Sequence, residues 1–232
     1  MVHPGGVTCL DVHAKQMRVV TAGGGALAVH DLARLGESPG AAAEVAGRLE
    51  TGGLAGFRDL RWASYDEVVT ASTIGGLQVW DVRGRVAGSR VSPGEWGSGG
   101  GLCAVDIHPG RPHVCLTGAE DGTVAVWDLR FGSRPVSARA GAGEVWGVRF
   151  SGSSGAEMPG GGSLSAGYLC TGEGAVGLVH TAPGGALEVR AVAQESGSAV
   201  GMDVRGTGSA EDVACVTSHE CLTFLHSRVT AA

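Results

Sequence analysis

The residues that could support a chemical reaction are few and scattered. Gly172-Glu173-Gly174-Ala175-Val176-Gly177 matches G-x-G-x-x-G, the fingerprint of dinucleotide-binding folds. In those folds a helix begins at the glycines, and its N-terminus holds the pyrophosphate. Here the next residues, Leu-Val-His-Thr-Ala-Pro-Gly-Gly, are typical of a strand that ends in a turn. The motif therefore predicts a tight turn between strands, and we expect no cofactor.

Residues spaced to bind a metal ion or to act as a catalytic nucleophile are also scarce. His108 and His113 flank Pro-Gly-Arg-Pro, which predicts a hairpin loop, and a metal ion would need further ligands that are not nearby. No Gly-x-Ser-x-Gly elbow occurs. The cysteines have no C-x-x-C spacing and fall mostly in apolar runs, which predicts buried reduced thiols in a cytosolic or nuclear protein. They are Cys9, Cys103, Cys115, Cys170, Cys215 and Cys221. The sequence thus favours a protein that is not an enzyme and has no small-molecule substrate.

The composition argues against two further classes of protein, those that bind nucleic acid and those that span a membrane. The formal net charge is −6 and no Lys/Arg cluster occurs, which argues against direct nucleic-acid binding. No apolar run is long enough for a membrane span, and the N-terminus lacks the features of a signal peptide. With 42 glycines and 8 prolines, 43% hydrophobic and 17% charged residues, the chain fits many short strands joined by glycine-rich turns.

The stretch 113–130, HVCLTGAEDGTVAVWDLR, is the clearest element. An apolar run is followed by Glu-Asp-Gly and then by alternating residues, which predicts a β-hairpin. A threonine after two apolar residues recurs at intervals of 46 to 54 residues, and an aromatic or imidazole side chain follows nine or ten residues later. The threonines are Thr21, Thr70, Thr117, Thr171 and Thr217, and the partners are His30, Trp80, Trp127, His180 and His226. Strand-rich repeats of about 40–50 residues indicate a β-propeller.

The sequence predicts an all-β fold with five repeats of four strands each, except that the fifth lacks its outermost strand. The repeats cover about 7–50, 56–92, 102–140, 144–193 and 199–229, within a single domain spanning 1–232. Within the fourth repeat, 151–166 is rich in Gly, Ser and Pro and predicts a flexible loop.

Several repeat positions have a predicted structural role. Asp121 can accept hydrogen bonds from its own turn backbone. Trp80 and Trp127 provide an apolar body and one N–H donor, suited to a blade interior beside Thr70 and Thr117. The acid and the arginine that follow each tryptophan, in Trp-Asp-x-Arg, end a strand at one rim. They predict a solvated rim of ion pairs or, alternatively, a partner-docking point. These rim residues are Asp81, Arg83, Asp128 and Arg130.

The pattern Thr…Asp-Gly…Trp-Asp resembles the WD-repeat (WD40) family and extends over the whole chain, weakening in the outer repeats. A closer resemblance lies in Glu67–Gly75 leading into Leu77–Arg83, and in Cys103–Pro109 leading to Glu120–Asp128. Pro135-Val136-Ser137, Glu144-Val145-Trp146 and Asp203-Val204 followed by Cys215-Val216-Thr217 continue it in order. This order is similar to that of the small seven-bladed WD-repeat nucleoporins of the Y-shaped scaffold complex of the nuclear pore.

The resemblance implies a non-enzymatic scaffold subunit in the outer ring of the nuclear pore complex, at the nuclear envelope. Its partners would be other nucleoporins of the Y complex, and its process pore assembly with transport of RNA and protein. It also implies that the five repeats are the C-terminal five of seven, with two blades upstream of Met1. Departures are the loop 151–166 and the loss of Trp-Asp in the fourth and fifth repeats. An alternative hypothesis is a substrate receptor of a cullin-type ubiquitin ligase, docked through Arg83 and Arg130.

Overall fold

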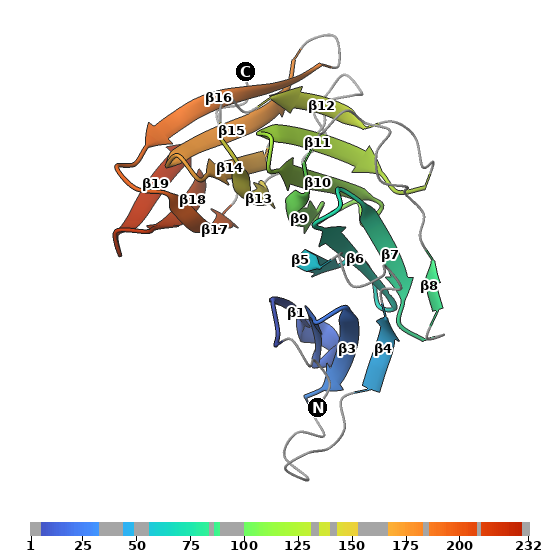
Figure 1. Ribbon diagram of the computed structural model, residues 1–232. Coiled ribbons are helices and arrows are strands. Elements are labelled where there is room, and N and C mark those ends of the chain that lie inside the picture. Colours follow the sequence, from blue (N-terminus) through green and yellow to red (C-terminus); the bar gives the residue numbers. More distant parts are fainter. Residues whose placement is uncertain are drawn as a thin grey trace. The chain divides into compact units, whose positions relative to one another are not determined.

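The computed structural model describes residues 6–32, 44–48, 56–83, 86–88, 100–130, 135–139, 143–152, 167–182, 186–207 and 210–228. These residues form nineteen β-strands and one 3-10 turn, η1 (Ala14–Gln16). The strands build five separate sheets, four of four strands and one of three, and neighbours in each sheet are consecutive in the chain (Figure 1). The predicted all-β class and its blade-like repeats are thereby confirmed.

Each repeat forms its own antiparallel sheet. The first sheet contains β1 (Cys9–His13), β2 (Arg18–Gly23), β3 (Ala26–Asp31) and β4 (Glu44–Arg48). The second contains β5 (Phe57–Trp62), β6 (Glu67–Ser72), β7 (Leu77–Asp81) and β8 (Val86–Gly88). The third contains β9 (Leu102–Ile107), β10 (Val114–Ala119), β11 (Thr123–Asp128) and β12 (Val136–Arg139). The fourth contains β13 (Val145–Phe150), β14 (Gly167–Thr171), β15 (Ala175–Thr181) and β16 (Leu187–Gln194). The fifth contains β17 (Ala199–Thr207), β18 (Ala210–Thr217) and β19 (Leu222–Arg228).

The turn between the second and third strands sets the register of each sheet. Gly75, Gly122 and Gly174 occupy one position of this turn with φ of 81°, 81° and 85°. A side chain at such a φ is strained, so glycine is the favoured residue there. Each of these glycines donates its backbone N–H to the carbonyl oxygen three residues earlier. The turn glycine therefore identifies equivalent residues in different sheets.

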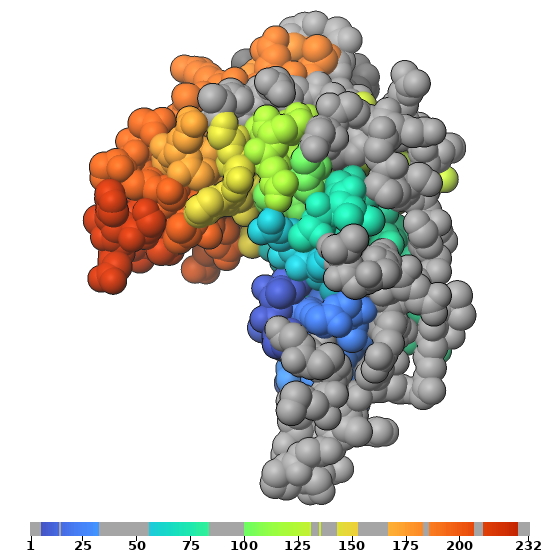
Figure 2. Space-filling model, in the orientation of Figure 1, coloured from blue at the N-terminus to red at the C-terminus, as the bar shows by residue number. Residues whose placement is uncertain are grey.

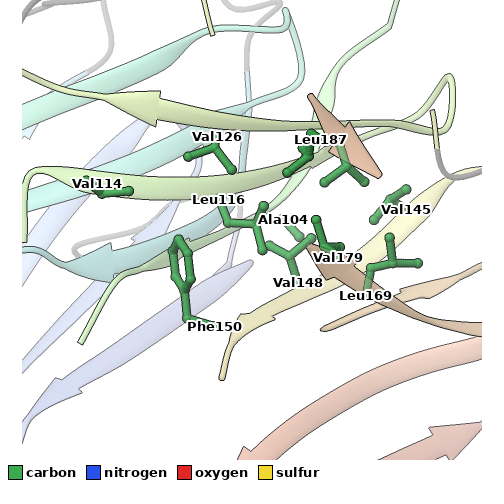
Figure 3. Close-up of a cluster of buried hydrophobic side chains, with 11 residues drawn as sticks. Ala104, Val114, Leu116, Val126, Val145, Val148, Phe150, Leu169, Val179 and Leu187 are labelled. Atoms are coloured by element: carbon green, nitrogen blue, oxygen red, sulfur yellow. The ribbon is translucent and has the colours of Figure 1, made fainter. Parts of the chain in front are cut away.

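The chain divides into two compact units, 1–102 and 103–232. In the first unit the apolar core joins the first and second sheets and includes Leu27, Leu60 and Trp80, each almost fully buried. The second unit has two cores. One joins the third and fourth sheets around Leu116 and Val148 (Figure 3), and the other joins the fourth and fifth sheets.

Two predictions from the sequence are not tested by this structure. The sequence predicts a glycine-rich loop at 151–166, and residues 153–166 of this loop lie outside the described residues. That the repeats form a single domain over 1–232 also stays a prediction. Among the described residues, no helix is long and apolar enough to cross a membrane.

Candidate interaction surface

The two tryptophans of the repeat pattern lie inside their sheets, where each indole donates to a threonine. Trp80 Nε1 lies 3.0 Å from Thr70 Oγ1, and Trp127 Nε1 lies 2.8 Å from Thr117 Oγ1. All four side chains are buried. Each bond joins the second and third strands of its sheet diagonally, since Thr70 pairs with Gln78 and Thr117 with Ala125. These pairs fix the interior of a blade and are not available to a partner.

The acid after each tryptophan binds the arginine two residues later. Asp81 Oδ1 accepts the backbone N–H and Nε–H of Arg83 at 2.9 and 3.0 Å, and Asp81 Oδ2 lies 2.7 Å from Nη2. Asp128 and Arg130 form the same ring at 3.0, 3.0 and 2.6 Å. In each case the neighbouring arginine lowers the pKa of the carboxyl from 3.8 to about 2.

The arginines of these rings are exposed on the surface of their own units. Their Nε and Nη2 edge is already occupied by the aspartate, which orients the guanidinium along the end of the strand. Arg83 also lies 3.5 Å from Asp66. The rim predicted from the sequence is therefore a set of closed ion pairs, each of which presents an oriented guanidinium to solvent.

Asp121 holds the turn between β10 and β11. Its Oδ1 accepts the backbone N–H of Thr123 at 2.9 Å, and the adjacent Gly122 has a positive φ. By bonding its own backbone two residues on, the Asp121 side chain stabilises the turn of the hairpin.

The assignment of His180 and His226 to the tryptophan position is wrong. Counted from the turn, Thr171 and Thr217 match Ser72 and not Thr70, because all three carbonyls accept the N–H of the turn residue. Thr171 Oγ1 also accepts from Ala175 N as Ser72 Oγ accepts from Gly76 N.

The tryptophan position of the fourth and fifth sheets is apolar. Val179 and Leu225 stand there, and Leu169 and Cys215 stand at the threonine position. The histidines lie one residue further on and face acids instead: His180 lies 3.5 Å from Glu188, and His226 lies 2.6 Å from Asp212. In the first sheet, Thr21 Oγ1 and His30 Nε2 are 2.9 Å apart. His30 therefore occupies the tryptophan position there and bonds the repeat threonine, as Trp80 and Trp127 do in their sheets.

Sequence reasoning missed a set of contacts between neighbouring sheets. Asp11 Oδ2 accepts the backbone N–H of Trp62 at 2.9 Å, and Asp106 Oδ2 accepts that of Phe150 at 2.7 Å. Both aspartates lie on the first strand of a sheet, and both acceptor bonds reach the first strand of the next. The partners are tens of residues apart, and no local motif marks them.

A second missed feature is a buried carboxylate. Glu211 on β18 is almost fully buried and accepts from Ser151 Oγ and, at 3.0 Å, from Tyr168 OH. A buried carboxylate requires such donors. The signal in the sequence is weak, because Glu211 lies beside Asp212 in a segment that resembles a turn.

The possible chemical motifs are structural. The G-x-G-x-x-G motif forms the turn between β14 and β15, with Gly174 at its centre and a strand after it. His108 is buried, and its Nδ1 accepts from Gly110 N within the predicted loop. In the described part of the chain, no group of three or more His, Cys, Asp or Glu side chains could hold a metal ion.

The six cysteines are free thiols. Cys115, Cys170 and Cys215 are buried, and Cys221 is exposed. Burial raises the pKa of Cys170 to about 12 and also raises that of Cys115. The buried thiols of Cys115 and Cys170 are therefore poor nucleophiles, because the thiolate is the reactive form.

Part of the chain is similar to known proteins. It is 42% identical over 89 residues to the nuclear pore complex protein NUP43 of Arabidopsis thaliana. It is 38% and 37% identical over 94 residues to nucleoporin Nup43 of Mus musculus and of Homo sapiens. Each match covers 36% of this chain and 22–24% of the relative, so the matched part spans less than a quarter of those proteins. No protein-family model matches the chain.

Proposed function

We propose that this protein is a non-enzymatic structural subunit of the nuclear pore complex, located at the nuclear envelope and bound to other nucleoporins. The observation that carries the proposal is the identity of 37–42% to proteins named as nucleoporins in a plant and in two mammals. Identity at this level over about 90 residues is typical of common descent. The blade-like sheets fit a WD-repeat subunit.

The finer proposal is a place in the Y-shaped complex of the outer ring, with a part in pore assembly and in transport of RNA and protein. It rests on the order of the repeat motifs in the sequence. The buried Trp80–Thr70 and Trp127–Thr117 pairs support it, because they make the second and third sheets rigid. A scaffold subunit needs surfaces that keep their shape when a partner binds.

Within this proposal, Arg83 and Arg130 are candidate docking residues. Each is exposed and held in place by its own aspartate, so little side-chain entropy is lost when a partner binds. An acidic partner surface would suit the oriented guanidinium groups.

The cullin-receptor alternative is not favoured. The relatives found are proteins named as nucleoporins in a plant and in two mammals.

The test is affinity purification of the tagged protein from its own cells, with quantitative mass spectrometry and imaging of the same fusion. We expect nucleoporins in near-equal amounts and a fluorescent rim at the nuclear envelope. A matched control is the fusion with Val148→Asp, which places a charge in the core of Figure 3 and unfolds the second unit. Recovery of a cullin and its adaptor without nucleoporins would overturn the proposal.

A second fusion, with Arg83→Ala and Arg130→Ala, separates the docking residues from the function. Loss of nucleoporins from a folded double variant assigns the rim to binding. Unchanged recovery removes these two arginines from the interface and leaves the nucleoporin role intact.

A further inference from the structure

One tryptophan of the chain lies at the surface instead of inside a sheet. Among the tryptophans that the structure describes, Trp80 and Trp127 are buried and Trp62 is half-buried, whereas Trp146 is 38% exposed. It lies on β13, the first strand of the fourth sheet. Tryptophan is among the residues most enriched at the centres of protein interfaces, so an exposed one is a candidate binding residue.

A β-bulge turns this side chain outward. Val145 pairs with Thr171 and Gly147 pairs with Cys170, so Trp146 is an extra residue of β13 without a counterpart in β14. Val145 is fully buried, while the indole next to it reaches solvent. Bulges re-aim side chains in this way and are frequent beside functional sites.

The exposure of Trp146 does not result from a missing neighbouring sheet. The fourth sheet packs against the third sheet through one core and against the fifth through another, within the same unit. Figure 2 shows residues of 143–152, in yellow, at the surface between the green of the third sheet and the orange of the fourth and fifth sheets. The packing of the sheets on one another therefore leaves the tryptophan accessible.

The indole ring is held in place by its own sheet. Trp146 Nε1 donates to Glu144 Oε2 at 2.6 Å, and the carbonyl oxygen of Glu144 accepts the backbone N–H of Gly172 at 2.9 Å. The ring also lies against Gly172, where a Cβ atom would be 3.1 Å from Cε2 of the indole and 3.3 Å from Cζ2. A ring that is oriented before binding loses little side-chain entropy when a partner contacts it.

Carboxylates surround this tryptophan. The segments 143–147, 171–175, 194–200 and 217–221 lie at one end of the fourth and fifth sheets, where β13 and β17 begin and β14, β16 and β18 end. We call these four segments the turn end. They contain one histidine, no Lys or Arg, and four glutamates, which are Glu144, Glu173, Glu195 and Glu220. The turn end is therefore an acidic surface with an exposed indole on it.

The indole and the carboxylates together suit a guanidinium group. Glu144 is bonded to the indole, and the Glu173 side chain lies against Gly143, where a Cβ atom would be 2.9 Å from its Cδ. Both carboxylates are exposed. A guanidinium can stack on an indole ring and bind a carboxylate at the same time. An apolar side chain would contact the ring but would leave the carboxylates unpaired.

We propose that Trp146, Glu144 and Glu173 form a docking site for an arginine in a basic segment of a partner protein. The guanidinium would stack on the exposed part of the indole and pair with Glu144 or Glu173. Arg83 and Arg130 follow the ends of β7 and β11, whereas this site lies where the third strand of its sheet begins, and it requires a partner of the opposite charge. The proposal does not rest on the nucleoporin role.

Charge disfavours two other occupants of this site. Nucleic acid would bring its phosphates against the glutamates of the turn end. A second copy of this chain has a formal net charge of −6, and like charges at an interface oppose binding. A basic segment of a different protein is the remaining class.

The probe for this site is a fluorescently labelled peptide of Gly-Arg repeats, whose binding to the purified 232-residue chain is followed by fluorescence anisotropy at low ionic strength. Trp146→Leu keeps an apolar side chain but removes the aromatic ring, and we expect at least about fivefold weaker binding. Glu144→Gln combined with Glu173→Gln keeps an acceptor for the indole but removes both charges, and we expect a similar loss. A peptide of Gly-Lys repeats should bind less tightly, because an ammonium group lacks the planar face of a guanidinium.

The matched control is Glu188→Gln combined with Asp203→Asn. It removes the same charge from two exposed acids of the same unit that lie outside the turn end. We expect this variant to bind the Gly-Arg peptide within about twofold of the unchanged chain, since a surface charge away from the site is screened by salt.

Each outcome decides for or against the site. Losses confined to the turn-end variants, with unchanged circular dichroism spectra, support it. An equal loss in the control would mean a general attraction to an acidic protein and would overturn the site. Unchanged binding by Trp146→Leu would also overturn it, because the ring would then have no part in binding. If Trp146→Leu does not fold, the comparison of the double glutamine variant with the control decides, since both of its positions are exposed.

Discussion

The indole Nε1 of Trp80 donates a hydrogen bond of 3.0 Å to Oγ1 of Thr70, and both side chains are at most 1% exposed. In the fourth sheet the same two positions hold Val179 and Leu169, both buried. Donor and acceptor have thus been replaced together. A buried polar pair is tolerated when complete, and an apolar pair is tolerated in its place, but half of the polar pair is costly.

Thr70→Val should therefore destabilise the protein, since it leaves the buried N–H of Trp80 without this acceptor. The shape of the side chain is almost unchanged, so the loss reports the hydrogen bond. We expect the free energy of unfolding to fall by about 1–3 kcal/mol, measured by urea denaturation.

The control for this prediction is Trp80→Phe, which removes the donor. In a Trp80→Phe background, Thr70→Val should cost much less than it does alone. Equal costs in the two backgrounds would mean that the threonine acts through packing and not through the indole.

The strands could be predicted from the sequence because their signals are local. Alternating apolar residues between an Asp-Gly turn and a Trp-Asp end define β10 and β11 without any distant contact. The contacts between sheets could not be predicted in this way. Asp11 and Trp62 are 51 residues apart, and nothing near Asp11 marks its partner.

The register of the fourth and fifth sheets was predicted wrongly for a related reason. The threonine is a common strand residue, and Thr171 and Thr217 lie two residues closer to the turn than Thr70 does to Gly75. The turn residue is the better reference, because its positive φ is a backbone requirement. In the fifth sheet this residue is Glu220, so the turn cannot be recognised in the sequence by its glycine.

Replacing Glu220 by glycine should stabilise the fifth sheet. Glu220 has a φ of 60° at the position where Gly75, Gly122 and Gly174 stand. A left-handed conformation costs a non-glycine residue about 1–2 kcal/mol, part of which the freer unfolded chain offsets. We expect Glu220→Gly to raise the free energy of unfolding by about 0.5–1 kcal/mol in urea.

Gly122→Ala is the matching control for the turn argument, since it places a side chain at the same φ in the third sheet. It should destabilise the protein by about 1 kcal/mol. A destabilised Glu220→Gly variant would mean that the Glu220 side chain contributes more than its backbone costs.

Asp106→Ala should weaken the junction of the third and fourth sheets. It removes the acceptor of the Phe150 N–H, a charge-assisted hydrogen bond of 2.7 Å. We expect a loss of about 1.5–3 kcal/mol in the free energy of unfolding. Asp203→Ala is the control, because that carboxylate is exposed and makes one 3.4 Å contact; its loss should stay below about 1 kcal/mol.

The ring of Asp128 and Arg130 predicts a titration shift. Hydrogen bonds from Arg130 lower the pKa of Asp128 from 3.8 to about 2. The ion pair therefore stabilises the folded state above pH 3.8, and this contribution is lost as the pH falls through about 2. In Arg130→Gln the carboxyl resonance of Asp128, followed by NMR, should titrate at a higher pH than in the unchanged chain, because the side-chain hydrogen bonds are lost. Arg83→Gln should leave the Asp128 titration unchanged, and a shift in that variant would point to a cause other than the local ring.

Replacement of Glu211 should destabilise the protein strongly, because this residue is 1% exposed and its carboxylate accepts hydrogen bonds from two hydroxyl groups of the fourth repeat. Ser151 follows β13 and Tyr168 lies in β14, so one side chain on β18 joins the fourth sheet at both flanks of the segment 153–166. Glu211→Gln keeps the shape but replaces one acceptor oxygen by a donor. We expect a fall of about 1.5–3 kcal/mol in the free energy of unfolding.

Tyr168→Phe should cost less in the Glu211→Gln background than alone, since the two groups share one hydrogen bond. Full additivity would mean that Tyr168 acts only by packing, and an unchanged stability of Glu211→Gln would exclude the carboxylate as the link between the sheets.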